Sequence, residues 1–285
     1  MKKLLYIPTF GEEVANTISH GVMAIVMLLS LPFAAVWSFT HAVGNNIESA
    51  IGVSIFVISI FMMFLTSTLY HSMSPNSKHK DIFHILDHIM IYVAIAGSYT
   101  PVALTVIGGW QGVLIVVIQW AMVLFGVFYK SLSKRSIPAI SLTIYLIMGW
   151  TVIFFLPLFL RNSSLPLLIL IAAGGIFYTI GAWFYAKKGF KYHHLVWHLM
   201  INIAAACHFV ALVFFLNMYQ KRCSKNQFEH LFFYQHFTLF FHRISSYGYV
   251  GDTRICIHFY NSIKESWFHL CSLQSHNYFC CLTHL

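Results

Sequence analysis

The sequence predicts an all-α integral membrane protein, a seven-transmembrane helix bundle whose N-terminus is cytoplasmic. Composition is the first reason, because 59% of the 285 residues are apolar and only 9% are charged. A soluble domain usually carries about 25% charged residues, so a soluble globular enzyme is excluded. The apolar runs are long and do not alternate with polar residues, which favours helices over a β-barrel. The abundance of large apolar side chains also excludes a disordered chain.

Seven stretches are long enough to cross a bilayer, whose apolar core of ~30 Å needs about 20 residues of helix. Turn-forming segments rich in Gly, Asn, Ser and Lys separate them. The predicted spans are residues 18–40, 49–71, 83–106, 112–129, 137–158, 165–186 and 195–217. Residues 1–17 form a cytoplasmic segment in this scheme, because their apolar stretch is too short for a signal peptide.

The basic residues of the loops set the orientation, since Lys and Arg collect on the cytoplasmic side. On the N-terminal side lie Lys2, Lys3, Lys78, Lys80, Lys130, Lys134, Arg135, Lys187, Lys188 and Lys191. The opposite side carries only Arg161 up to residue 219. This bias predicts a cytoplasmic N-terminus, the reverse of a rhodopsin-type receptor. It also explains the net charge of +9 without a nucleic-acid partner, and we expect none.

The composition changes after about residue 219. Residues 220–285 hold five of the six cysteines and seven of the 17 histidines, without any persistent period. A metal-binding tail, a disulfide-linked outer segment and a translation outside its natural reading frame are the three alternatives. No CxxC pair is present, and we favour the third alternative. We therefore predict that residues 18–219 form the transmembrane domain and that the tail is not part of the fold.

Ionisable side chains inside the spans are costly and usually functional. Asp87, about one turn into the third span, is the only carboxylate in a predicted span. His71 ends the second span, whereas His194 and His198 lie at the start of the seventh. With the predicted topology, all four residues lie at the cytoplasmic end of the bundle. Nothing in the composition alone requires this coincidence.

These residues match the donor set of a metal hydrolase. His194 and His198 are four residues apart and share a helix face. With His71 they provide three imidazoles, the ligand number of a catalytic zinc that keeps one position open for water. Asp87 is predicted to bind or orient that water, or to act as its general base. Ser67 lies one helical turn before His71 and faces the same way, so we predict Asp87 and Ser67 as the catalytic pair beside Zn²⁺.

Other interpretations of the same residues stay open. Histidines spaced like His194 and His198 also occur at membrane interfaces among lipid headgroups, and Ser67 would then bond to a carbonyl of its own helix. His20 lies at the same level and is either a further ligand or a packing residue.

Further polar and small residues have structural interpretations. His84 and His88 flank Asp87 and are candidates to pair with it. His208 lies in the middle of the seventh span, where we predict an interhelical hydrogen bond. The sixth span is predicted to have a close-packing face of small residues formed by Gly174, Gly175 and Gly181.

Several of these segments resemble a known family. They are EEVANTISHG (12–21), STLYHS (67–72), DHIMIYVAIAGSYTP (87–101), GGIFYTIGAWFYAKK (174–188), HHLVWH (193–198) and HF (208–209). In this order they resemble the bacterial hemolysin III proteins, the prokaryotic branch of the progestin and adiponectin-receptor family. The resemblance covers roughly residues 10–219. It implies a seven-helix fold with a cytoplasmic N-terminus, and a zinc held near the cytoplasmic face by His71, His194 and His198, with Asp87 and Ser67 beside it.

The wider superfamily includes ceramidases, which hydrolyse amides, and the bacterial name implies haemolysis. We therefore expect a zinc-dependent hydrolase of a lipid amide or ester, located in the bacterial inner (plasma) membrane. Its partners would be the lipid bilayer and a membrane lipid as substrate. A receptor- or sensor-like protein with a structural zinc and a cytolysin are the two alternatives.

Overall fold

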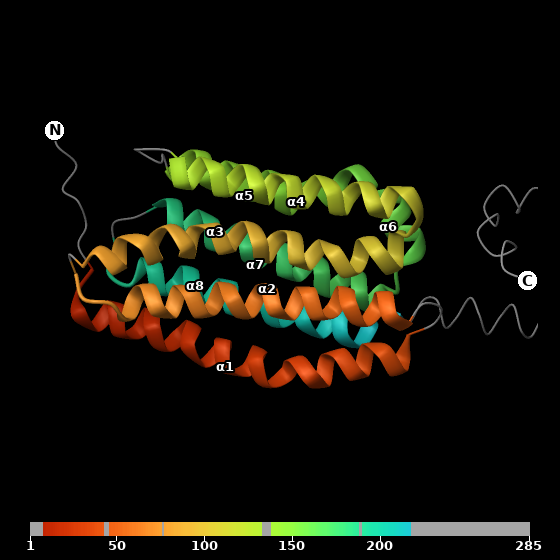
Figure 1. Cartoon of the computed structure of the whole chain (residues 1–285), viewed down its shortest axis with the longest axis horizontal. Coiled ribbons are helices and arrows are strands. Elements are labelled where there is room, and N and C mark those ends of the chain that lie inside the picture. The colour runs from red at the N-terminus through yellow and green to blue at the C-terminus, as the bar shows by residue number, and fades with distance from the viewer. Residues whose placement is uncertain (1–7, 43–45, 76, 133–137, 188–189, 218–285) are drawn as a thin grey trace, which may run out of the picture. The chain divides into compact units, whose positions relative to one another are not determined.

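The computed structural model describes residues 8–42, 46–75, 77–132, 138–187 and 190–217 (Figure 1). The described residues form helices and turns without any strand, so the all-α prediction is confirmed. Within these ranges, seven helical stretches are long and apolar enough to cross a membrane. The chain is therefore a multi-pass membrane protein. The predicted tail, residues 220–285, lies outside the described residues.

The helices succeed one another along the chain and run side by side (Figure 1). The elements are α1 (Phe10–His41), α2 (Asn46–Ser72), α3 (Lys78–Pro101), η1 (Val102–Ile107), α4 (Gly109–Leu132), α5 (Pro138–Gly149), η2 (Trp150–Phe155), α6 (Leu156–Asn162), α7 (Leu165–Lys187), α8 (His193–Val210) and η3 (Ala211–Phe215). The third, fifth and seventh spans are composite: α3 continues into η1, α5 passes through η2 into α6, and α8 continues into η3.

The first helix begins at Phe10, well before the predicted start of its span at residue 18. Thr9 caps it with a capping box, in which the backbone N–H of Thr9 donates to Glu12 at 2.8 Å. Glu12, Asn16 and His20 recur every four residues and are 3%, 1% and 2% exposed. This polar stripe is turned into the bundle. A search for a continuous apolar run misses it for that reason.

The fifth span changes its helical geometry midway. Residues Trp150–Phe155 wind as a 3₁₀-helix between α5 and α6. Tyr99 of α3 bridges this break, because its hydroxyl donates to the carbonyl of Gly149 at 2.6 Å and accepts the N–H of Val152 at 2.9 Å. Backbone groups inside a membrane need such partners, since no water is available to replace them.

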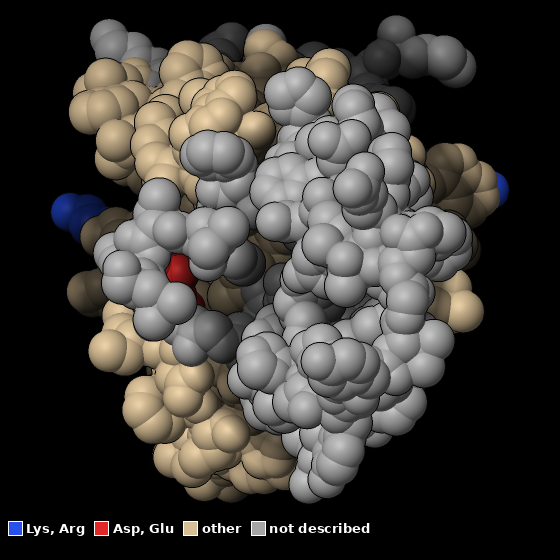
Figure 2. All heavy atoms as spheres, turned by 90° about the vertical axis from the view of Figure 1, so that its right-hand side faces the viewer, with Lys and Arg blue, Asp and Glu red and all other residues tan. Residues whose placement is uncertain are grey.

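Helix α2 packs between α1 and α3, and α8 contacts both α1 and α7. Buried apolar side chains such as Phe56, Phe64 and Leu212 fill the core. Large apolar side chains also cover the outside, including Phe154, which is 82% exposed. In the end-on view of Figure 2, the described residues on the flanks of the bundle carry very few charges. A surface of this kind is suited to lipid rather than to water.

Two of the three predicted packing glycines are confirmed. A Cβ on Gly174 would overlap the imidazole of His208, and one on Gly181 would lie 2.8 Å from the ring of Trp197. Gly175 differs, because a Cβ there would meet nothing within 4 Å. The predicted interhelical bond of His208 is also present, with its Nε2 atom 3.3 Å from the carbonyl oxygen of Ile171.

Candidate metal centre

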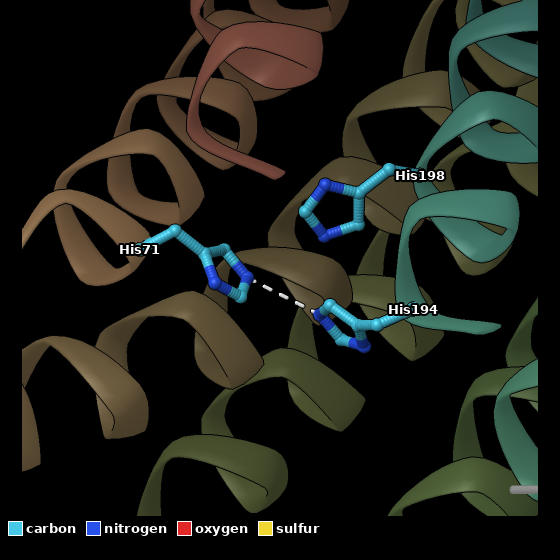
Figure 3. A group of neighbouring side chains, drawn as sticks. All are labelled: His71, His194 and His198. Carbon is cyan, nitrogen blue, oxygen red and sulfur yellow. Dashed lines mark hydrogen bonds between the residues drawn. The ribbon is translucent and has the colours of Figure 1, made fainter. Parts of the chain in front are cut away.

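Three histidines from two helices meet at the end of the bundle where the described chain begins (Figure 3). His71 lies in the last turn of α2, and His194 and His198 lie in the first turns of α8. The Nε2 atoms of His71 and His194 are 3.2 Å apart. One ring nitrogen from each histidine lies within 4.8 Å of the others, so the group could hold a metal ion.

Helix α8 starts in a way that sets the position of its histidines. Tyr192, immediately before it, adopts a left-handed conformation with φ of 63°. The N–H of Tyr192 donates to Oε1 of Glu12 at 2.7 Å, which fastens the start of α8 to the first turn of α1. His194 and His198 then follow on one face of α8, one helical turn apart.

Asp87 and Ser67 lie beside the histidine cluster. Asp87 belongs to α3, and its carboxylate is close enough to the hydroxyl of Ser67 on α2 to interact with it. The same carboxylate interacts electrostatically with His71 and with Lys130, a buried lysine at the end of α4. The carboxylate and hydroxyl singled out in the sequence are therefore paired with each other next to a histidine of the cluster.

The Nδ1 atoms of two clustered histidines face partners on α1. Nδ1 of His71 lies 2.5 Å from Oε2 of Glu13, whose other oxygen accepts from Nζ of Lys80 at 2.8 Å. Nδ1 of His198 lies 3.1 Å from the hydroxyl of Ser19. Helix α1 thus contacts the cluster through the Nδ1 atoms of two histidines, although none of the three histidines belongs to it.

The remaining histidines of this end do not join the cluster. His20 stacks flat on His198, with ring centroids 3.6 Å apart and an angle of 7° between the planes. This stacking supports the packing interpretation of His20. Nδ1 of His88 lies 2.7 Å from the carbonyl oxygen of His84, and their rings meet edge to face. Among the described residues, the group with a metal-holding spacing consists of His71, His194 and His198.

Comparison with known proteins places this chain in a family. The family model described as "Haemolysin-III related" matches residues 9–209. The Hemolysin-3 homolog of Bacillus subtilis (strain 168) is 35% identical over 210 residues, which cover 73% of this chain and 95% of that relative. Hemolysin-3 of Bacillus cereus is 34% identical over 206 residues, which cover 72% of this chain and 92% of the relative.

The chain belongs to the haemolysin-III related family. The family resemblance read from the sequence segments is thereby confirmed. A more distant relative of this haemolysin-III related protein is the monocyte to macrophage differentiation factor of Homo sapiens, 27% identical over 213 residues, which cover 73% of this chain and 85% of the relative. The matched range, residues 9–209, contains the three clustered histidines, Asp87 and Ser67.

The sequence predictions for this haemolysin-III related chain do not include the α1 residues around the cluster. Glu12, Glu13 and Ser19 stood within the segment EEVANTISHG but received no role. Two adjacent carboxylates and a hydroxyl at the entry to a membrane helix are a usable signal, because such groups inside a bundle need polar partners. The partners themselves come from α2, α3 and α8, and the sequence gives no direct indication of that choice.

Proposed function

We propose that this protein is a zinc-dependent membrane hydrolase that cleaves an amide or ester bond of a membrane lipid. One observation carries the proposal: three imidazoles and a carboxylate–hydroxyl pair, drawn from α2, α3 and α8, gather at one end of a membrane bundle. Three protein ligands with a carboxylate nearby are the composition of catalytic zinc sites, which keep a position open for water or substrate.

The donor geometry supports zinc at this cluster. Zinc binds imidazole nitrogen at about 2.0–2.1 Å with tetrahedral angles, which places two neighbouring ligand nitrogens about 3.3 Å apart. The 3.2 Å between the Nε2 atoms of His71 and His194 agrees with that spacing. His71 and His198 are buried, and His194 is partly exposed.

Asp87 and Ser67 would supply the acid–base and hydrogen-bonding groups. Zinc, when bound, polarises a carbonyl and increases the acidity of water. Asp87 would accept the proton of the attacking water while the water oxygen bonds to the carbonyl carbon. It would then return this proton to the nitrogen or oxygen that leaves as the old bond breaks. Ser67 would orient the carboxylate and donate to the oxygen on which negative charge develops.

The surroundings support a lipid as substrate. The flanks of the bundle are apolar, so a substrate that reaches the cluster from the side arrives through the bilayer. The loop charges support a cytoplasmic position for the histidine end. We therefore propose a site at the cytoplasmic face of the bacterial plasma membrane.

Metal analysis of the purified protein, combined with lipid mass spectrometry of cells with and without the gene, tests the proposal. We expect about one zinc per chain and a lipid amide or ester that falls as its cleavage products rise. A folded, metal-free protein would end the proposal. Zinc without any lipid change would instead favour a sensor-like protein with a structural metal.

Red-cell lysis provides the third outcome, because two relatives carry the name hemolysin. Lysis by the purified protein that persists after zinc removal would favour a cytolysin over a hydrolase. The hydrolase proposal expects no such zinc-independent lysis.

A further inference from the structure

We infer that α1 positions two histidines of the cluster. Glu13 orients His71 and Ser19 orients His198, so that the Nε2 atom of each ring is directed toward a bound metal. This inference rests on the proposed metal site and adds to it two residues with an assigned role.

Glu13 determines the protonation of the His71 ring. An ionised carboxylate can only accept hydrogen bonds, so the short contact of its Oε2 atom requires the proton on Nδ1 of His71. The Nε2 atom of a neutral His71 ring then carries a lone pair and faces the cluster. A carboxylate behind a metal-binding imidazole also makes the ring a stronger ligand and fixes its orientation.

Ser19 places the ring proton of His198 on Nδ1 as well, through a different hydrogen bond. A serine hydroxyl has one hydrogen, and that of Ser19 is donated to the carbonyl oxygen of Asn16 at 2.8 Å. The hydroxyl oxygen must therefore accept from Nδ1 of His198, 3.1 Å away. Nε2 of His198 is left with its lone pair, as in His71. Two unrelated contacts from one helix thus select the same tautomer.

The placement of Glu13 is itself fixed. Its Oε1 atom accepts from Lys80, whose ammonium also donates to the carbonyl of Met73 at 3.3 Å. Lys80 belongs to the first turn of α3, and Met73 directly follows α2. The carboxylate therefore links α1, α2 and α3, and its orientation toward His71 does not depend on a single flexible contact.

Charge balance points in the same direction. Three neutral imidazoles leave a divalent cation with its full charge, which is costly in a water-poor site. Glu13 on α1 and Asp87 on α3 are carboxylates that both interact with His71. Both carboxylates also interact with an ammonium group, Glu13 with Lys80 and Asp87 with Lys130, so each offsets only part of the cation's charge, and Glu13 acts through the imidazole that it holds.

The test measures zinc affinity in the full-length protein with a competing chelator. Glu13→Ala is expected to weaken binding about 10- to 100-fold, the usual effect of losing an outer partner. Glu13→Gln, which keeps an acceptor oxygen without its charge, should lose less zinc affinity than Glu13→Ala. Ser19→Ala should also weaken binding, but less than Glu13→Ala, because a neutral hydrogen bond is weaker than one to a carboxylate.

Two matched variants control for the loss of a carboxylate and for the loss of a hydroxyl from α1. Asp81→Asn removes an exposed carboxylate at the same end of the bundle. Ser30→Ala removes an α1 hydroxyl that bonds to the carbonyl of Met27 in its own helix. Both should bind zinc within twofold of wild type.

A spectroscopic measurement separates positioning from a general loss of structure. Cobalt in place of zinc reports ligand geometry through its visible spectrum, and Glu13→Gln should change that spectrum while circular dichroism stays unchanged. Wild-type affinity together with an unaltered cobalt spectrum in both Glu13 variants would overturn the inference. A wild-type protein that binds no metal would instead refute the proposed function on which it rests.

Discussion

His71 and His194 bring their Nε2 atoms to 3.2 Å from each other, although 123 positions separate them in the chain. The contact joins the end of α2 to the start of α8 and closes the cluster that His198 completes. Two imidazole nitrogens at this distance either share a proton or share a cation. With the proton of His71 placed on Nδ1 by Glu13, its Nε2 lone pair is available to accept a hydrogen from His194 or to bind a cation.

His194→Ala should abolish stoichiometric zinc binding. One of three ligands is lost, so we expect affinity to fall by more than about 100-fold, beyond the effect of losing an outer partner. Metal content after size-exclusion chromatography measures it. His79→Ala, at an exposed histidine of the same end, is the matched control and should retain the metal. Full zinc occupancy in His194→Ala would contradict the assignment of the ligands.

Asp87→Asn should retain zinc but lose lipid hydrolysis. The amide is nearly the same size and can still bond to Ser67, but it cannot accept the proton of water. General acid–base catalysis contributes about 10²- to 10⁴-fold, and we expect a loss in that range. Turnover of the lipid identified by mass spectrometry measures it, with Asp81→Asn as the control. Wild-type turnover in Asp87→Asn would remove Asp87 from the mechanism.

Gly174→Ala should destabilise the bundle, because the added Cβ would overlap the ring of His208. Overpacking of this kind costs about 1–3 kcal/mol. Gly175→Ala is the matched control on the next residue, where a Cβ meets nothing within 4 Å. Thermal unfolding in detergent should show a lower Tm for Gly174→Ala and an equal or higher Tm for Gly175→Ala. Equal Tm values for both variants would show that the α7–α8 contact is loosely packed.

The topology can be tested with reporters that are active on only one side of the membrane. A cytoplasmic reporter at the N-terminus should be active, whereas the same reporter in the loop near Arg161 should not. The loop charges are the physical reason, since Lys and Arg are retained on the cytoplasmic side. Activity at the Arg161 loop would place the histidine end on the outer face.

Most of the fold could be predicted because a bilayer restricts the possibilities. Only helices and closed barrels satisfy the backbone in lipid, so an apolar run of sufficient length already indicates a span. The boundary of the first helix was the least accurate, because Glu12 and Asn16 interrupt the apolar run at its start. Gly175 was grouped with its packing neighbours because the sequence does not reveal the rotation of α7 about its own axis.

The sequence by itself determined the class of molecule, the number of spans and the residues that could meet at one membrane level. His71, Asp87, His194 and His198 could be selected because an ionisable group in lipid is costly and therefore rarely accidental. Only the tertiary structure decided which atoms face one another. The pairing of Ser67 with Asp87, the stacking of His20 on His198 and the contacts of Glu13 and Ser19 depend on helix rotation and tilt, and side-chain packing between helices sets these in three dimensions.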